Sequence, residues 1–237
     1  MIGFLVAAAS FAPVARANTA VGYETFKSGG RRYHAVKADL ASGLVSAETV
    51  YADRLVSPWA LVTRSYPIAA ITGTFFAPQD GTPVADVLVD GALVARGNRG
   101  SVLGVTDSGE IVIADKGYRR KFDWSGIKYG LRGAVRLISN GTVNPNPRAQ
   151  RFRDPRIWGR AARTGVGVDS RGKLVMVATK QSVTLSELGR AMRKQGVVDA
   201  VSLDGGGSTC LYYMGRMVVS TPRKLSNMFV ITNTTGL

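Results

Sequence analysis

The stretch Val197–Tyr213, VVDAVSLDGGGSTCLYY, decides the fold and holds the main candidate site. It begins with VVDAVSL, a mostly apolar run that predicts a strand buried on both faces. Asp204 follows directly, so we expect the acid at the C-terminal end of that strand. Three consecutive glycines and two hydroxyl side chains then lead to a second apolar run that begins at Leu211. The stretch therefore predicts strand, loop and strand, with a carboxylate at the start of a loop of open backbone.

The glycine loop is suited to an anion. Gly205–Gly207 have no Cβ and accept positive φ, so successive N–H groups can converge on a phosphate, and Ser208 and Thr209 add hydroxyl donors. Asp204 lies too close to such a phosphate to attract it, so we expect its carboxylate to face another part of the ligand. The loop has neither the Lys of a Walker A sequence nor GxGxxG spacing, which disfavours NTPases and dehydrogenases. From the loop alone, a plain irregular turn is an equally good interpretation.

Short strands joined by tight turns account for much of the remaining chain. Apolar runs on both sides of 107–109 and of 169–172 predict two hairpins. YPIAAITGTFFAP, Tyr66–Pro78, predicts a buried strand that ends in a loop at Gly73. Further strands are expected over 33–52 with a turn at Gly43, over 212–219 as a hairpin, and over 228–232.

One helix is predicted with its caps over Ser182–Gly196, SVTLSELGRAMRKQG. Thr184 is a natural N-cap, Glu187 completes a capping box, and Gly196 can end the helix. The apolar face that packs on the sheet consists of Leu185, Leu188 and Met192. We therefore expect this helix to be structural and Glu187 to be engaged by its cap.

Composition favours one sheet-rich domain. The chain has 237 residues, 45% of them hydrophobic, and its 28 glycines indicate many tight turns rather than a helical bundle. We predict an α+β fold, a single sheet-rich mixed domain with a few packed helices. Cys210 is the only cysteine, so no internal disulfide can form, and the formal net charge of +15 should attract polyanions such as nucleic acid, anionic glycan or a phosphorylated substrate.

An arginine-rich segment, 144–165, contains three prolines and six arginines. A loop of this length in a small domain is usually functional or mobile, and the alternative is a solvated excursion. Its charges, with Phe152 and Trp158 among them, also motivate nucleic-acid binding as an alternative function.

The N-terminus has an apolar run that ends in Ala15-Arg16-Ala17, the small-x-small pattern of a secretory cleavage site. This predicts a signal peptide over 1–17, a domain over 18–237, and an exported, periplasmic or secreted protein. Since no Lys or Arg precedes the apolar run, an ordinary apolar segment is the alternative. No other membrane span is expected.

Four ordered motifs together resemble the phosphodiester glycosidase family over about 33–232. The motifs are ITGTFFAP (71–78), RTGVGVDSRGKLVMVATK (163–180), VVDAVSLDGGGSTCLYYMGRMV (197–218) and KLSNMFVIT (224–232). The resemblance implies hydrolysis of a sugar 1-phosphodiester of the GlcNAc 1-phosphate type, on an envelope glycan or glycoconjugate, with cleavage between the anomeric carbon and oxygen. Two residues depart from the family pattern: Thr72 replaces an Asn, and Arg136 stands in a stretch that is apolar or carries Pro in the family.

The expected catalytic residues are Asp204 and Arg163. Asp204 would act as base, nucleophile or electrostatic stabiliser, and Arg163 would grip phosphate through its forked donors. The substrate-binding residues are expected to be Gly73, Thr74, Phe75, Phe76, Thr164, Gly205, Gly206, Gly207, Ser208, Thr209 and Asn227. For at least one of the two Phe residues, core packing is the better interpretation.

No cofactor or metal is expected, because no His, Cys and Asp group shows metal-ligand spacing. His34 is the only histidine and lies far from Ser208 in the sequence, which disfavours a Ser/His/Asp triad. The expected partner is a sugar phosphate or anionic glycan, with no specific nucleic acid. A noncatalytic glycan binder or a nucleic-acid-binding protein is the alternative function.

Overall fold

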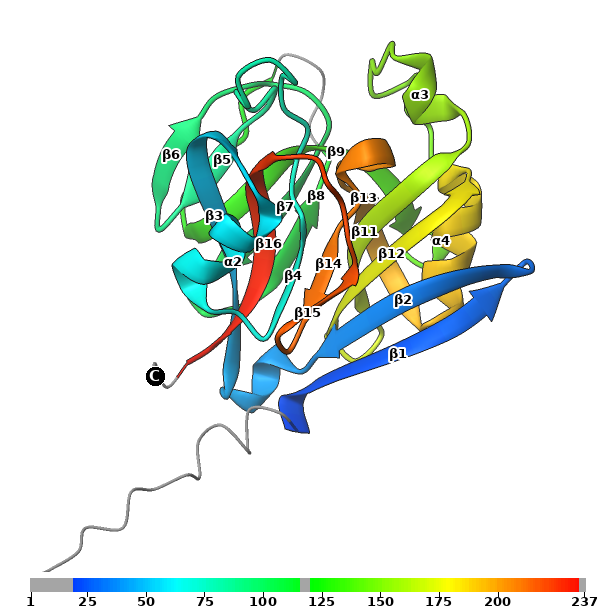
Figure 1. Cartoon of the computed structure of the whole chain (residues 1–237), viewed down its shortest axis with the longest axis horizontal. Coiled ribbons are helices and arrows are strands. Elements are labelled where there is room, and N and C mark those ends of the chain that lie inside the picture. The colour runs from blue at the N-terminus through cyan, green and yellow to red at the C-terminus, as the bar shows by residue number, and fades with distance from the viewer. Residues whose placement is uncertain (1–18, 116–119, 235–237) are drawn as a thin grey trace, which may run out of the picture.

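The computed structural model describes residues 19–115 and 120–234, which form two antiparallel sheets packed face to face (Figure 1). The larger sheet has the order β1-β2-β12-β11-β13-β9-β5-β6, with β7 and β10 also paired to β9, and β8 paired to β7. Its strands are β1 (Val21–Ser28), β2 (Arg31–Ala38), β12 (Leu174–Val183), β11 (Ala161–Asp169), β13 (Val197–Ser202), β9 (Ile127–Ser139), β5 (Val87–Val89), β6 (Ala92–Ala95), β7 (Ser101–Thr106), β8 (Ile111–Ala114) and β10 (Thr142–Val143).

The smaller sheet has the order β15-β14-β4-β16-β3. Its strands are β15 (Arg216–Val219), β14 (Leu211–Tyr213), β4 (Ala69–Thr72), β16 (Leu225–Asn233) and β3 (Val45–Val56). The helices are α2 (Pro58–Ser65), α3 (Pro155–Trp158) and α4 (Leu185–Lys194), with short 3-10 turns η1 (Leu40–Ser42) and η2 (Gly206–Ser208). The sheet-rich architecture with few helices is thus confirmed.

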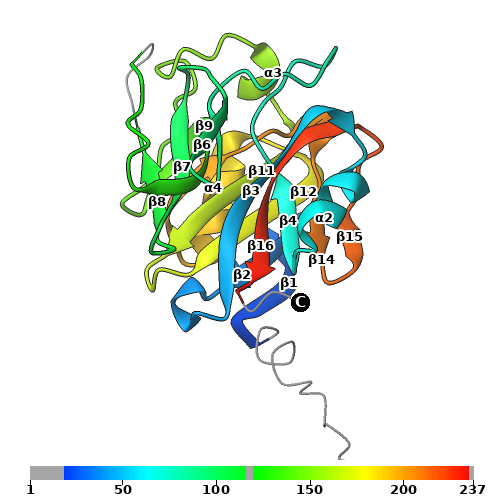
Figure 2. The ribbon, with the colours of Figure 1, turned by 90° about the vertical axis from the view of Figure 1, so that its left-hand side faces the viewer.

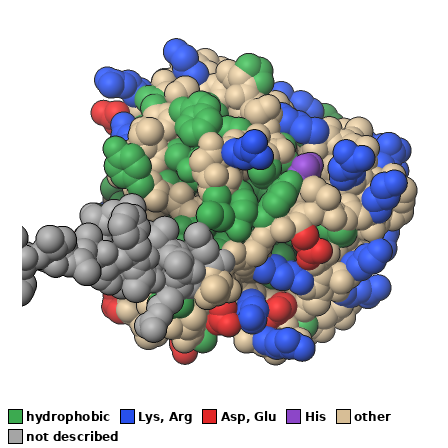
Figure 3. Space-filling view, turned by 60° about the horizontal axis from the view of Figure 1, so that its bottom comes forward, with side chains coloured by type: hydrophobic (Ala, Val, Ile, Leu, Met, Phe, Trp, Pro, Cys, Tyr) green, Lys and Arg blue, Asp and Glu red, His purple; other side chains and the backbone are tan. Residues whose placement is uncertain are grey.

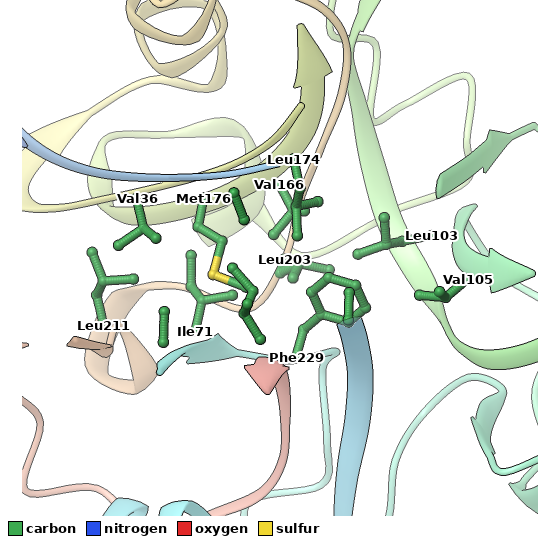
Figure 4. Close-up of a cluster of buried hydrophobic side chains, with 14 of the residues drawn as sticks. Val36, Ile71, Leu103, Val105, Val166, Leu174, Met176, Leu203, Leu211 and Phe229 are labelled. Atoms are coloured by element: carbon green, nitrogen blue, oxygen red, sulfur yellow. The ribbon is translucent and has the colours of Figure 1, made fainter. Parts of the chain in front are cut away.

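The main core lies between the two sheets. Val166 and Met176 of the larger sheet face Ile71 and Phe229 of the smaller one, all fully buried (Figure 4). Helix α4 packs on the outer face of the larger sheet, and α2 on the outer face of the smaller sheet (Figure 2). The layers are therefore helix, sheet, sheet and helix.

Strand β13 is covered on both faces, as its apolar sequence predicted. Val197 and Ala200 pack in the cluster formed with α4, while Val201 and Leu203 pack between the sheets. Its neighbours β11 and β9 are both antiparallel to it. A strand in an inner layer needs apolar residues on both sides, whichever way its neighbours run.

The local turn and cap predictions are confirmed. Hairpins join β7 to β8, β11 to β12 and β14 to β15. Thr184 and Glu187 form the predicted capping box, and Gly196 follows α4 with φ of 86°. The sequence predicted neither the strands β1, β5, β6, β9 and β10 nor the helices α2 and α3. A signal for α2 was present, since Ser57 caps this helix and Pro58 opens it, a common helix start.

The expected strands around Gly43 form, but they belong to different sheets. β2 pairs with β12, whereas β3 pairs with β16, and the chain crosses between sheets through η1 and Gly43. The predicted signal peptide at 1–17 lies outside the described residues, so export stays a prediction. Among residues 19–115 and 120–234, no helix is both long and apolar enough to span a membrane.

On the face that Figure 3 shows, positive charge is distributed over several edges rather than gathered in one strip. Figure 3 shows Lys and Arg side chains around several edges of one face, on both sides of a hydrophobic area. In the arginine-rich segment, the aromatic side chains have internal contacts: Arg148 lies 4.5 Å from the Trp158 ring, and Phe152 is buried. This arrangement gives a general field for polyanions but does not favour the nucleic-acid alternative.

Candidate active site

The ends of β13 and β4 meet and bring the two sheets together at the candidate site. The amide of Asp204, just after β13, donates to the carbonyl oxygen of Gly73, just after β4, at 2.9 Å. Gly73 in turn donates to the carbonyl oxygen of Asn227 in β16, at 3.2 Å. Loops from both sheets therefore converge beside Asp204.

A cleft of about 320 Å³ opens at this junction. One wall is the loop after β4, the second is the segment around α3, and the floor carries Asp204 and the glycine loop. The lining residues are Phe75, Phe76, Pro78, Val84, Arg99, Phe152, Asp154, Arg156, Ile157, Ala161, Arg163, Asp204, Gly205, Gly206, Gly207 and Arg223. The lining thus combines apolar side chains with four arginines and two aspartates.

Asp204 has a raised pKa in this cleft. Burial raises the pKa of its carboxyl group from 3.8 to about 6. The Ser208 hydroxyl and the Gly205 amide, which donates to Oδ1 at 2.9 Å, oppose that increase, as do the guanidinium groups of Arg223 and Arg156. The Asp204 carboxyl group can therefore exchange a proton near neutral pH, as a catalytic base must.

The glycine loop turns tightly beneath the cleft. A Cβ on Gly205 would lie 2.7 Å from the carbonyl oxygen of Ala162, and Gly206 has φ of 56°, so both positions favour glycine. The amides of Ser208 and Thr209 donate back into the turn, to the carbonyl oxygens of Gly205 and Gly206.

Fewer loop amides than the sequence suggested are therefore available to a ligand. Within the described part of the chain, the amides of Gly206 and Gly207 make no hydrogen bond. The hydroxyls of Ser208 and Thr209 are buried and lack a hydrogen-bond partner there, although Ser208 lies close enough to Asp204 to lower its pKa. Two of the loop amides thus remain without a hydrogen-bond partner among the described residues.

Arginines that sequence reasoning missed supply most of the charge at the mouth of the cleft. Arg223 lies against the loop, since a Cβ on Gly207 would sit 3.3 Å from its Nε. Arg156 pairs with Asp154, and hydrogen bonds from Arg156 lower the pKa of that carboxyl group. Arg99 also lines the cleft. The arginine-rich segment was the sequence signal for Arg156, whereas nothing near Arg223 identified it.

Arg163 lies in the cleft, but its guanidinium group is largely engaged. Nη2 donates to the carbonyl oxygens of Arg156, Ile157 and Gly159 at 2.6–3.1 Å, and Nε donates to Val183. Burial lowers the pKa of Arg163, while nearby Asp204 raises it. Arg163 therefore holds α3 and the residue after it in place, and among the contacts of the described residues only its Nη1 has no hydrogen-bond partner.

Four predicted contact residues lie behind the cleft wall. Asn227 Oδ1 accepts from the Thr74 amide at 2.6 Å and its Nδ2 donates to the Thr74 carbonyl at 3.3 Å. A Cβ on Gly73 would lie 2.0 Å from the same Oδ1. The Thr164 hydroxyl donates to the backbone oxygen of Asp204 at 2.7 Å. These residues position the site rather than line it, as buried polar groups with complete partners usually do.

The two phenylalanines divide as expected. Phe76 is buried and packs with the core around α2, although its edge also lines the cleft. Phe75 is half-buried, contacts Phe152 at 5.9 Å between ring centroids, and lines the cleft. Phe75 is therefore the more exposed of these two side chains in the cleft.

The two departures from the family pattern do not line the cleft. The Thr72 hydroxyl is fully buried, donates to Ser208 O at 2.6 Å and accepts from Cys210 N at 3.0 Å. Arg136 forms an ion pair with Asp199.

His34 lies in the β1–β2 hairpin, and one of its ring nitrogens shares a hydrogen bond of 2.7 Å with the Tyr23 hydroxyl. His34 does not line the cleft. In the described ranges, no group of three or more His, Cys, Asp or Glu could hold a metal ion.

Comparison with known proteins identifies enzymes of similar sequence. N-acetylglucosamine-1-phosphodiester alpha-N-acetylglucosaminidase of Mus musculus is 29% identical over 165 residues, covering 62% of this chain and 32% of that protein. The Homo sapiens enzyme of the same name is 27% identical over 165 residues, with the same two coverages. The chain thus spans about a third of the length of these curated relatives.

Solved structures show the same fold. The catalytic domain of the zebrafish enzyme of that name has a TM-score of 0.73 at 17% identity, covering 90% of this chain and 82% of that one. A Synechocystis protein has a TM-score of 0.72 at 15% identity, covering 90% of this chain and 62% of that one. The sequence model for phosphodiester glycosidases matches residues 65–232, which include β4, α3, Asp204 and Arg223. Because that match spans both walls and the floor of the cleft, the chain belongs to the phosphodiester glycosidase family.

Proposed function

We propose that this protein hydrolyses a sugar 1-phosphodiester of the GlcNAc 1-phosphate type. The observation that carries the proposal is one cleft in which Asp204, with its raised pKa, lies beside Arg223 and Arg156. Breaking a glycosyl phosphate creates positive charge at the anomeric carbon and leaves negative charge on the phosphate. The site must therefore stabilise charges of both signs within a short distance of each other. Family membership supports this reaction class.

In the proposed reaction, water attacks the anomeric carbon as the bond from that carbon to the phosphate oxygen breaks. The electron pair of the broken bond goes to the phosphate oxygen, and Asp204 accepts the proton that water releases. The products are a free sugar and the phosphate monoester of the other partner. Since phosphate is a good leaving group, it needs little protonation, and one carboxylate can suffice.

The cleft suggests a place for each end of the substrate. Phe75 would contact the sugar, while Arg223, Arg156 and the amides of Gly206 and Gly207 would bind phosphate. Phosphate binding by Arg163 would use Nη1, because its other nitrogens already donate to carbonyl oxygens. Export remains part of the proposal, and an exported protein would meet such phosphodiesters in envelope glycans.

One assay separates the proposed function from its alternatives. Release of GlcNAc from a GlcNAc 1-phosphodiester is measured alongside binding of the same compound by calorimetry. We expect both release and binding. Binding without release would identify a noncatalytic glycan binder. Tight, sequence-selective DNA binding at physiological salt without release would identify a nucleic-acid-binding protein.

The pH profile is expected to follow Asp204. Because the base must be ionised, kcat/KM should rise tenfold per pH unit below about 6 and level off above it. The measurement is kcat/KM for GlcNAc release between pH 4 and 8, in buffers of constant ionic strength. A profile that is flat across this range would show that Asp204 is not the base.

Arg223→Gln is expected to weaken phosphate binding. Hydrogen bonds to charged groups contribute about 1.5–3 kcal/mol, so kcat/KM should fall roughly 10- to 100-fold. Arg216→Gln is the matched control, since Arg216 is exposed in β15 and does not line the cleft. Similar losses in the two variants would show that only the general positive field matters.

A further inference from the structure

Three large apolar side chains are exposed on the side of the smaller sheet that carries α2. Tyr66 is 77% exposed, Trp59 48% and Met214 46%. The Met214 amide donates to the carbonyl oxygen of Ile68 at 2.9 Å, so the turn between β14 and β15 lies beside the loop that follows α2. The Trp59 ring meets the Tyr212 ring edge-on, with 5.8 Å between centroids. We call the following residues the basal surface: Trp59, Arg64, Tyr66, Met214 and Arg216.

The backbone beneath two of these side chains is unfavourable for large residues. Tyr66 has φ of 44° and Met214 has φ of 42°. In this left-handed region Gly and Asn are favoured, whereas a bulky side chain is strained. Both side chains are exposed, so burial in the core does not account for them. Because strained residues cluster at functional sites, the two positions favour a contact between these side chains and a partner.

The segments that build the basal surface carry only positive charge. Residues 54–79 and 205–237, which include α2, β4 and β14 to β16, contain five arginines and lysines and no Asp or Glu. In the described part of the chain, neither Arg64 nor Arg216 takes part in an ion pair. Both guanidinium groups can therefore contact the anionic groups of a partner.

The basal surface and the cleft lie at opposite ends of two paired strands. β4 begins at Ala69, which pairs with Tyr213, and ends just before Gly73, whose carbonyl oxygen accepts from the Asp204 amide. β14 begins after the glycine loop and ends at Tyr213, directly before Met214. Figure 1 likewise shows α3 at one end of the molecule and the turn between β14 and β15 at the other. A partner on the basal surface therefore leaves the cleft open.

The N-terminal sequence joins the domain at the same end. The Tyr213 hydroxyl donates to the carbonyl oxygen of Val21 at 3.2 Å, so β1 begins beside the basal surface. Residues 1–18 contain one charged residue, Arg16. An apolar sequence that enters a membrane during export would bring this end of the domain to the lipid. Figure 3, which brings this end of the molecule forward, shows a hydrophobic area with Lys and Arg side chains on both sides.

These features fit an anionic lipid surface better than a protein partner. Tyr and Trp are enriched where hydrocarbon meets lipid headgroups, because each has an apolar body and a polar tip. Arginine is attracted to anionic headgroups. A stable protein interface needs about 20–30 residues on each side, far more than the basal surface has. Membrane binding instead scales with the apolar area inserted plus the charge attraction, so a few side chains of both kinds suffice.

We infer that the basal surface binds an anionic lipid surface. Tyr66, Trp59 and Met214 lie among the headgroups, and the two arginines contact lipid phosphates. The binding is peripheral and reversible, and it directs the cleft away from the membrane. None of these contacts involves a residue that lines the cleft.

The test is cosedimentation of the full chain with lipid vesicles. One set of vesicles contains about 30% phosphatidylglycerol in phosphatidylcholine, and the other contains phosphatidylcholine alone. We expect the wild type to bind the anionic vesicles at least about tenfold more tightly. The variant that combines Tyr66→Asn with Met214→Asn should lose at least about tenfold in affinity for the anionic vesicles. Because Asn is favoured at positive φ, its Tm should equal or exceed that of the wild type, which separates lost binding from unfolding.

Two single variants separate charge from apolar contact. Arg216→Gln removes one cation and should weaken binding to the anionic vesicles about fivefold. Val94→Ser is the matched control, because Val94 is 42% exposed but lies in β6 of the larger sheet. Its binding should stay within about twofold of the wild type. Every variant keeps residues 1–18, so binding by that segment is the same in all of them. No substrate is present, so the result does not depend on the proposed reaction.

Three results would overturn the inference. The first is a wild type that does not bind the anionic vesicles. The second is equal binding by the wild type and the double Asn variant, which would assign the lipid contact to residues 1–18 or to the general positive field. The third is a concentration-dependent dimer in sedimentation velocity that the double variant loses, which would assign the basal surface to a second copy of the chain.

Discussion

Replacing Asp204 with Asn is expected to lower kcat for GlcNAc release by about 10³-fold. Asn has the same shape as Asp but cannot accept the proton from water, and a positioned base contributes about 10²- to 10⁴-fold. Binding of the intact phosphodiester should persist, because the arginines and loop amides are unchanged. Single-turnover release and calorimetric binding measure the two effects separately. Asp53→Asn is the control, since Asp53 is exposed in β3 and does not line the cleft.

The same variant should also be more stable than the wild type at neutral pH. The pKa of Asp204 is raised in the folded protein from 3.8 to about 6, so the folded state binds the proton more tightly than the unfolded state. Stability from this group is therefore present below about pH 4 and is lost as pH rises through about 6. Asn does not titrate, so its Tm should exceed that of the wild type at pH 7.5 and approach it at pH 3.5.

Retained hydrolysis in Asp204→Asn would remove Asp204 from the mechanism. A Tm of Asp204→Asn below that of the wild type at pH 7.5 would show that the ionised carboxylate stabilises the fold. That result would contradict the account, because burial is expected to make ionisation of Asp204 unfavourable in the folded protein. Catalytic groups are commonly held in unfavourable surroundings in this way.

Gly73→Ala is expected to damage both stability and activity. An added Cβ would lie 2.0 Å from Asn227 Oδ1, so the side chain that holds both backbone groups of Thr74 must move. Overpacking of this kind costs about 1–3 kcal/mol of unfolding free energy. Since the Gly73 carbonyl also accepts from Asp204 N, the carboxylate should shift and kcat should fall by about 10²-fold. Chemical denaturation and steady-state kinetics measure the two losses.

Gly22→Ala is the matched control for this change. Gly22 lies in β1, its φ is not positive, and no atom of the described residues other than its chain neighbours lies within 4 Å of the added Cβ. This variant should keep wild-type activity and stability within about 0.5 kcal/mol. Equal behaviour of Gly73→Ala and Gly22→Ala would contradict the role of the Gly73, Thr74 and Asn227 contacts.

The sequence predicted the features that depend on neighbouring residues. Strand β13 with Asp204 at its end, the capping box of Thr184 and Glu187, and the hairpin at 169–172 all follow from local patterns of polarity and turn chemistry. Local patterns also singled out Asp204 and Gly205–Gly207, which line the cleft, because these four residues are consecutive in the sequence.

The features that sequence reasoning missed depend on distant pairings. Thr74 and Asn227 are 153 positions apart, so nothing in the sequence indicated that each satisfies the other rather than a substrate. Arg223 reaches the cleft only because its segment folds over the glycine loop. Likewise, Arg163 was expected to bind phosphate, but α3 and Gly159 supply three carbonyl oxygens that accept from its Nη2. Tertiary contacts of this kind leave no periodic signal.

The position of bond cleavage tests the central claim most directly. Hydrolysis of a GlcNAc 1-phosphodiester is run in water enriched in ¹⁸O, and both products are analysed by mass spectrometry. Because water is proposed to attack the anomeric carbon with Asp204 as base, the label should enter the hydroxyl group of the released sugar, leaving the phosphate monoester unlabelled. Label in the phosphate monoester would show attack at phosphorus and would contradict the account.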